Sequence, residues 1–276
     1  MINMKYHFLL LIGVLAFLNP FLSNAETPSN TNFNHPGGVV EIRVDKKNTF
    51  LPEIQYGIHE PAIIEEENSW RILIGLSLDT IPGEYLVYLK HEIDGATSEH
   101  IKFFVEQKNY SVRVLNKKPK QTIKQVHLSL TKLDYENTQQ PNLPLRFPAE
   151  GDWNLEFGTV FFDNKSKKAN TQNQIFFETN SIINVRSPEN ALISNIIIQK
   201  DGSSTVFLDH GRGLYSVIGG ITDLNVEIGN GVVSGAVIGK VTPAASLKKN
   251  AVATNTLTWQ CILNGIYVNP TILTQL

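Results

Sequence analysis

The sequence predicts an all-β protein: an N-terminal β-sandwich followed by a second β domain, joined by a short linker that contains a helix. Two observations support this fold class. Short apolar runs stand between turn residues, and several of them alternate apolar with polar side chains, as half-buried strands do. The sandwich region has no helical period, and the chain length of 276 residues fits about two domains.

Composition narrows the functional classes. Hydrophobic residues make up 42% and charged residues 18% of the chain, which is enough apolar material for folded cores. The formal net charge is −2, so no general attraction to nucleic acid is expected. The single cysteine, Cys261, excludes a disulfide framework and a cysteine-rich metal site.

The first 25 residues have the pattern of a cleaved signal peptide. Lys5 precedes an apolar run over 8–18, Pro20 ends the run, and small residues over 23–25 provide a cleavage site. The run is too short to span a membrane, which takes about 20 apolar residues. We therefore expect a periplasmic or secreted protein whose mature chain has no transmembrane segment.

Residues 35–115 are expected to form a β-sandwich of the immunoglobulin type. The expected strands are Val39–Val44, Arg71–Leu78, Tyr85–Leu89, Ile101–Val105 and Tyr110–Leu115. Prolines and glycines separate them at a spacing typical of a sandwich. With one cysteine in the chain, the Cys–Trp–Cys framework of true immunoglobulin domains cannot be present.

Residues 116–150 are interpreted as the linker. Four lysines lie close together (Lys117, Lys118, Lys120 and Lys124). They fit a solvated charge run, with contact to an anionic polymer as the less common alternative. Residues 123–135 could form one short helix, after which Pro141, Pro144 and Pro148 disfavour regular structure.

Residues 151–276 return to strands. The expected strands are Val206–Leu208, Val226–Ile228, Val232–Val233, Val237–Ile238 and Leu257–Leu263. Gly-Asn-Gly at 229–231 predicts a hairpin turn. A phosphate-binding loop is excluded there, because no helix and no Lys-Ser/Thr pair follow the glycines.

These strands carry a family resemblance. Phe207 to Val241 contains Asp-His-Gly-Arg-Gly-Leu-Tyr and then a regular series of glycines, and Trp259 is followed by Asn-Gly and by Val-Asn-Pro at 268–270. This order resembles the lysostaphin/LytM-type zinc endopeptidases of the cell wall. Residues 74–110 are similar to the β-domain that precedes many periplasmic members. The resemblance implies a lysostaphin-like second domain, built on the duplicated hybrid motif.

The zinc ligands and the catalytic histidines of that family are missing at the matching positions. The resemblance places the first ligand pair, a His and an Asp, on Asn170 and Gln174, with an uncertainty of one or two residues. The histidine of its Tyr-x-His motif falls on Gly220, and its His-x-His pair falls on Thr256 and Thr258. These positions would line a vestigial groove, and the resemblance places Tyr215 near it as an aromatic platform.

No other constellation replaces the missing groups. Thr256 and Thr258 share one face of their strand, but two hydroxyls do not replace two imidazoles at a zinc ion. His210 is not a ligand position in the family, and we expect it to support a turn. The other histidines are scattered, and no Gly-x-Ser-x-Gly elbow is present. Cys261 shares strand parity with Leu257 and Trp259, which predicts a buried apolar filler.

The sequence therefore favours a pseudo-peptidase with no catalytic residues, no metal and no cofactor. Degenerate members of the family act as activators of division amidases, so the resemblance implies a cell-wall factor that binds peptidoglycan or regulates a peptidoglycan amidase. Two alternatives stay open. One is an active zinc endopeptidase that cleaves peptide crosslinks of peptidoglycan, and the other is a purely structural envelope or secreted protein.

Overall fold

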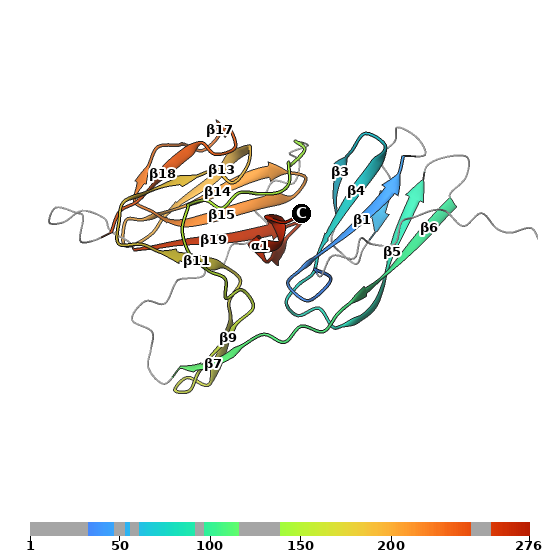
Figure 1. The fold of residues 1–276 in the computed structure, drawn as a ribbon, viewed down its shortest axis with the longest axis horizontal. Coiled ribbons are helices and arrows are strands. Elements are labelled where there is room, and N and C mark those ends of the chain that lie inside the picture. The colour runs from blue at the N-terminus through green and yellow to red at the C-terminus, as the bar shows by residue number, and fades with distance from the viewer. Residues whose placement is uncertain (1–32, 47–52, 56–60, 92–96, 116–138, 244–254) are drawn as a thin grey trace, which may run out of the picture.

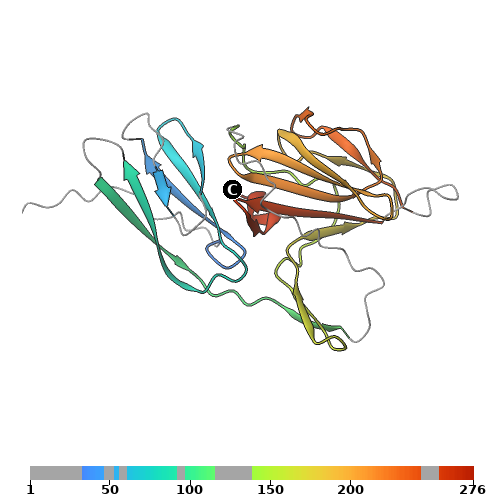
Figure 2. The same cartoon turned by 180° about the vertical axis from the view of Figure 1, so that it is seen from behind.

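The computed structural model describes residues 33–46, 53–55, 61–91, 97–115, 139–243 and 255–276. Almost all its regular structure is β, so the predicted fold class is confirmed. The expected signal peptide at 1–25 and the expected helix at 123–135 lie outside the described residues, as do the four clustered lysines. Figures 1 and 2 show two β bodies side by side, with the C-terminal segment between them.

The N-terminal body consists of two three-stranded antiparallel sheets. One has the order β1 (Val39–Asp45), β4 (Ser69–Gly75), β3 (Ala62–Glu65), and the other has the order β2 (Glu53–Gln55), β5 (Gly83–His91), β6 (Thr97–Val105). The two sheets face each other across one cluster of buried side chains, which includes Ile42, Ile72, Val87 and Phe103. This is a β-sandwich, as expected from the alternating apolar runs.

The strand expected at the end of the sandwich lies elsewhere. β7 (Val112–Leu115) pairs in parallel with β9 (Val160–Asp163), which also pairs with β10 (Lys168–Thr171). Figure 1 shows β7 and β9 together, away from the sandwich strands. The apolar pattern of 110–115 indicates a strand correctly, but it contains no information about which distant strand becomes its partner.

An eight-stranded sheet forms the centre of the second body. Seven strands follow the order β17 (Gly231–Val232), β13 (Ala191–Ile198), β14 (Ser204–Gly211), β15 (Leu214–Ile221), β19 (Thr256–Leu263), β11 (Ile175–Glu178), β8 (Trp153–Asn154), and β20 (Ile266–Val268) pairs with β19. A smaller sheet has the order β12 (Ile183–Arg186), β18 (Val237–Val241), β16 (Asp223–Leu224). The short helix α1 (Pro270–Leu273) follows β20.

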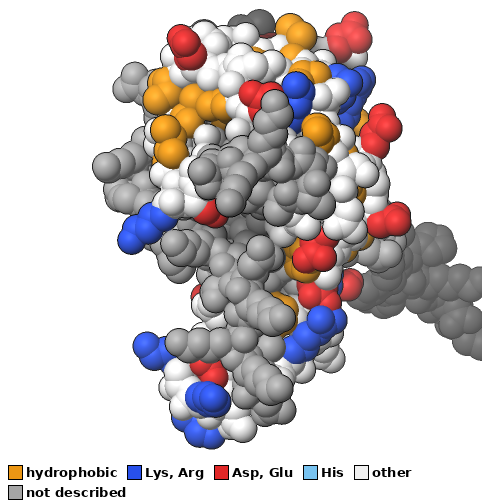
Figure 3. Space-filling model, turned by 90° about the vertical axis from the view of Figure 1, so that its left-hand side faces the viewer, with side chains coloured by type: hydrophobic (Ala, Val, Ile, Leu, Met, Phe, Trp, Pro, Cys, Tyr) orange, Lys and Arg blue, Asp and Glu red, His pale blue; other side chains and the backbone are white. Residues whose placement is uncertain are grey.

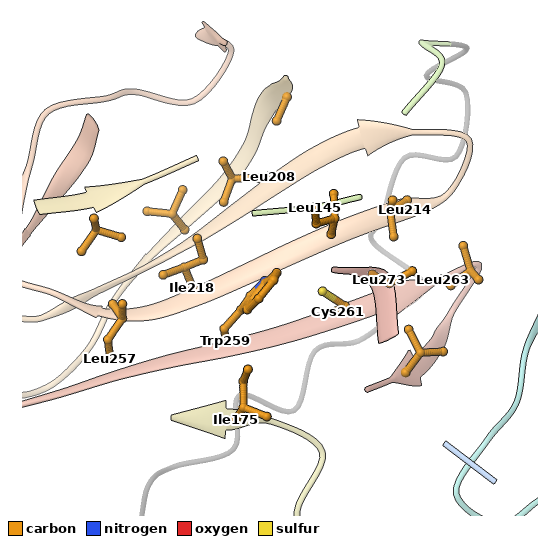
Figure 4. Close-up of a cluster of buried hydrophobic side chains, with 14 of the residues drawn as sticks. Leu145, Ile175, Leu208, Leu214, Ile218, Leu257, Trp259, Cys261, Leu263 and Leu273 are labelled. Carbon is orange, nitrogen blue, oxygen red and sulfur yellow. The ribbon is translucent and has the colours of Figure 1, made fainter. Parts of the chain in front are cut away.

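The large sheet has two different faces. One face packs against the smaller sheet in the main core, where Leu257, Trp259 and Cys261 contribute from β19. Figure 4 shows these side chains with Ile218 of β15 and Leu208 of β14. The opposite face of β14 and β15 has its own buried cluster of Phe207, Tyr215, Val217 and Ile262. Every residue of β14 is consequently buried, the polar residues at both of its ends as well as the apolar segment 206–208.

Two local expectations in this domain are wrong. Residues 226–228 form no strand, and Gly-Asn-Gly at 229–231 does not join a paired hairpin, because β16 pairs with β18 and β17 pairs with β13. The turn itself is present: the backbone N–H of Asn230 donates to the carbonyl of Glu227, and the Asn230 side chain accepts from the Glu227 N–H. The asparagine therefore closes a loop between strands of two different sheets.

Candidate functional site

The C-terminal strand β19 positions Thr256 and Thr258, which the resemblance matches to a pair of histidines. Thr256 and Thr258 are half-buried on one face of the strand, whereas Leu257, Trp259 and Cys261 point into the core on the other face. Because successive side chains of a strand point to opposite faces, β19 has one polar face and one apolar face. The prediction that Cys261 is a buried filler is confirmed, and burial raises the pKa of its thiol.

A row of side chains crosses the sheet at Thr258. Strand register aligns Thr258 with Gly219 of β15 on one side and with Phe176 of β11 on the other, and Gly219 is aligned in turn with Thr205 of β14. A Cβ added at Gly219 would lie 2.7 Å from Oγ1 of Thr258. The glycine therefore lets the threonine side chain occupy the space above β15.

Gly220, which the resemblance matches to the histidine of the Tyr-x-His motif, has a backbone that accepts no side chain. Its φ is +94°, and an added Cβ would lie 2.1 Å from the carbonyl oxygen of Thr256. The register shifts here, because Ser204 pairs with Ile221 while Thr205 pairs with Gly219. Gly220 is thus the extra residue of a β-bulge. No imidazole fits at this position without movement of the backbone.

The remaining predicted site residues are not all brought to this row. Gln174 is buried and directly precedes β11, the strand that neighbours β19. Asn170, in contrast, is exposed on β10 in a separate sheet. Tyr215 is fully buried among Phe207, Val217 and Ile262. The expectation of an aromatic platform at Tyr215 is therefore wrong, because apolar neighbours on the same face of the sheet enclose its ring.

Sequence reasoning missed several polar residues on the same face. The side-chain N–H of Gln260 donates to Oδ1 of Asn173 over 2.8 Å, and Gln199 donates to Oγ1 of Thr205 over 3.2 Å. Gln260 continues the parity of Thr256 and Thr258 along β19, and that alternation is the signal that could have identified it. The face is therefore polar near Thr258 and apolar where Tyr215 lies.

The residues at the matching positions do not fit a zinc ion. Zinc sites in proteins use cysteine, histidine, aspartate or glutamate, whereas Thr256 and Thr258 offer hydroxyls and Gly220 offers no side chain. Among the described residues, no group of three or more His, Cys, Asp or Glu side chains is close enough together to hold a metal ion. The residues of this face therefore offer no ligand set that would hold a zinc ion with its bound water.

His210 belongs to a buried hydrogen-bond network on the other side of the sheet. Its Nδ1 lies 2.9 Å from the carbonyl oxygen of Asn190, which fixes the proton on that nitrogen, so Nε2 accepts from the Ser216 hydroxyl over 2.8 Å. The indole N–H of Trp259 donates to the same hydroxyl over 3.2 Å. Burial lowers the pKa of His210 to about 4.

This network corrects the expected role of His210. The histidine lies in β14 and connects three elements, while the neighbouring Asp209 stabilises the turn by accepting the N–H of Gly211 over 2.8 Å. Ser216 and His210 resemble a nucleophile and its base in spacing, but both are fully buried. Their arrangement satisfies polar groups inside the core and gives no substrate access.

The comparison with solved structures identifies the fold. A putative peptidase M23 from Pseudomonas aeruginosa matches with a TM-score of 0.63 and 22% sequence identity, over 88% of this chain and 95% of that one. The chain has the fold of an M23 peptidase. The resemblance read from the Asp-His-Gly segment and the glycine series is thereby confirmed at the level of the fold, across both domains.

More distant structural similarities exist alongside the M23 fold match. A zinc-containing peptidase from Vibrio cholerae matches at 12% identity and a TM-score of 0.36, over 47% of this chain and 40% of that chain. Helicobacter pylori Csd3 matches at 10% identity and a TM-score of 0.39, over 84% of this chain and 71% of that chain. No family model and no curated protein matches the sequence.

One face of the molecule shows no dominant charge. Figure 3 shows acidic and basic side chains scattered over one end of the molecule, together with one gathering of hydrophobic side chains. This distribution agrees with the near balance of 24 basic and 26 acidic residues. Within the described ranges, no helix is both long and apolar enough to cross a membrane.

Proposed function

We propose that this protein is a non-catalytic, exported cell-wall factor that binds peptidoglycan or a peptidoglycan amidase through the polar face of β19. One observation carries the proposal: an M23 fold has Gly220, Thr256 and Thr258 where the family resemblance places catalytic histidines. The backbone at Gly220 adds support, since it accepts no side chain at all. The expected signal peptide supports a periplasmic or secreted location.

The chemistry of the face fits recognition of a neutral polar ligand. The hydroxyl groups of the half-buried Thr256 and Thr258 can exchange hydrogen bonds with the amides of a peptide or the hydroxyls of a glycan. Their desolvation costs less free energy than that of an ionised group. Phe176 stands beside Thr258 and offers an apolar contact within the same row.

The direct test fills this face with an indole. We expect Thr258→Trp to weaken binding to purified sacculi, or to the captured amidase, about tenfold, which corresponds to roughly 1.4 kcal/mol. Thr258 is half-buried beside Gly219, so the added ring covers the row without entering the core. Binding is measured by co-sedimentation with sacculi and by capture from envelope extract followed by an amidase assay.

The matched control is Thr80→Trp, which adds the same ring at a half-buried threonine of the sandwich domain. This control is expected to bind as the wild type does. If Thr258→Trp melts normally and also binds normally, the interaction surface lies elsewhere and the proposal fails at this face.

A further inference from the structure

A large open cavity lies on the side of the M23 domain opposite to Thr258. Its volume is about 1140 Å³, and its walls come from residues 146–155, from β12 and from the loop at Gly235. Strand register places it: Trp153 pairs with Phe177, which pairs with Leu257 on the core side of the sheet. Thr258 has the other parity, so the cavity and the polar face of β19 are separate surfaces.

Two aromatic rings form a fixed wall of this cavity. The ring centroids of Phe147 and Trp153 are 5.8 Å apart, and Phe147 also meets Trp259 edge-on at 5.6 Å. The Trp153 indole N–H donates to the carbonyl of Ala149 over 3.0 Å, which holds its orientation. Phe147 is 38% exposed although it packs against the core, so an aromatic surface on a rigid base remains open to solvent.

The rim of the cavity combines planar polar groups of both signs. Two guanidinium groups, Arg146 and Arg186, stand with two carboxylates, Glu150 and Asp152. Arg186 is positioned by a hydrogen bond of 2.9 Å from its Nη1 to the carbonyl of Gly235. The four formal charges cancel, so neither a polyanion nor a polycation gains net attraction.

We infer that this cavity binds an uncharged oligosaccharide. The apolar C–H face of a sugar ring packs on an exposed aromatic ring such as Phe147, while vicinal hydroxyls match the paired donors of a guanidinium and the paired acceptors of a carboxylate. The volume exceeds the range of about 300–1,000 Å³ typical of small-molecule sites, which favours several linked sugar units over one. The inference goes beyond the proposed function and rests on a different surface.

The test is titration of the full chain with two uncharged probes, the β-1,4-linked tetramer of N-acetylglucosamine and cellotetraose, by isothermal calorimetry. We expect saturable binding of at least one tetramer and a loss of tenfold or more in Phe147→Ala. Asn184→Ala, at an exposed cavity residue that does not belong to the core, is expected to weaken binding at least threefold with an unchanged melting temperature.

Controls separate this site from the polar face of β19. Phe104→Ala removes a ring that is 60% exposed on the sandwich and should bind the tetramer normally. Tetramer binding that Thr258→Trp abolishes and Phe147→Ala leaves intact would assign the ligand to the polar face of β19 and overturn the inference. Absence of saturable binding for both tetramers up to about 10 mM, ten times a 1 mM dissociation constant, overturns the inference. Wild-type affinity in both Phe147→Ala and Asn184→Ala overturns it as well.

Discussion

Gly220 shows how the local backbone excludes a side chain at a position where the family resemblance places a histidine. Its φ of +94° is unfavourable for any residue with a Cβ, and the Thr256 carbonyl occupies the place that the Cβ would take. A single histidine substitution there would not restore the imidazole of the Tyr-x-His motif, because the backbone would have to move first. The absence of a side chain at position 220 is therefore part of the local fold.

The first prediction follows from that geometry. Gly220→Ala is expected to lower the free energy of unfolding by at least about 2 kcal/mol, because it combines a strained φ with a clash against backbone. Urea denaturation measures the change. Gly231→Ala is the control, since a Cβ there meets nothing within 4 Å, and it should change stability by less than about 0.5 kcal/mol. Equal stability of the two variants would contradict the bulge geometry.

The buried network of His210 predicts a pH dependence of stability. The pKa of His210 is lowered to about 4 in the folded state by burial, against an ordinary value of 6.5. Between these pH values the unfolded chain binds more protons than the folded one. The free energy of unfolding is therefore highest above pH 6.5 and decreases as the pH falls toward 4. The loss amounts to about 3 kcal/mol.

Denaturation at pH 7 and at pH 4.5 tests this contribution. His210→Gln should lose much less stability between the two pH values than the wild type, although some loss remains, since burial also lowers the pKa of His35. His100→Gln, at an exposed histidine, should keep the wild-type difference. If the free energy of unfolding of His210→Gln changes between pH 7 and pH 4.5 as much as that of the wild type, the network does not exclude the proton from His210.

At the scale of elements, β4 explains how the two bodies are joined. Ile72 and Ile74 point into the sandwich core, whereas Leu73 belongs to the cluster that also contains Val268 and Leu273 of the M23 domain. The strand is buried on both faces, which accounts for its apolar sequence with little alternation. One strand thus belongs to two cores.

This double role makes Leu73→Ala a sensitive probe. We expect it to lower the free energy of unfolding by about 2–5 kcal/mol, the usual range for a cavity at a buried leucine. The control is Leu86→Ala on β5, where the side chain is 36% exposed and a smaller loss is expected. A Leu73→Ala protein as stable as Leu86→Ala would mean that the contact between the bodies contributes little.

The strands of both bodies show what the sequence could predict. Alternation identified β1, an apolar run between turn residues identified the middle of β5, and parity along β19 identified the core position of Cys261. The short strands β2 and β3 escaped notice because three or four residues give too little periodicity. The pairing of β7 with β9 and the turn at 229–231 depend on partners far away in the chain, which local patterns do not specify.

The candidate site was only partly predictable for a related reason. The resemblance located Thr256, Thr258 and Gly220 on neighbouring strands, and the structure places them there. It could not reveal that Tyr215 is enclosed, because β15 is covered on both faces and sequence parity does not distinguish an open face from a covered one. Nor could it reveal the positive φ of Gly220, which arises from a bulge in register with β14.

At the scale of the whole molecule, charged and polar contacts supplement the shared core. Arg71 of β4 donates to the Glu41 carboxylate over 2.6 Å and to the carbonyl oxygen of Leu276 over 2.9 Å. The backbone N–H of Asn269 donates to the carbonyl of Gly37. Figures 1 and 2 show α1 on the side of the M23 domain that faces the sandwich. These contacts give the cell-wall factor proposed above two domains that support each other.

Digestion of peptidoglycan tests whether an M23 fold works here without peptidase chemistry. Purified protein is incubated with purified peptidoglycan in the presence of added zinc, and released peptides are quantified by mass spectrometry. Because threonine hydroxyls neither hold zinc nor act as bases near neutral pH, we predict no release above a protein-free control. Zinc-dependent release of crosslink peptides that a chelator abolishes would contradict the account.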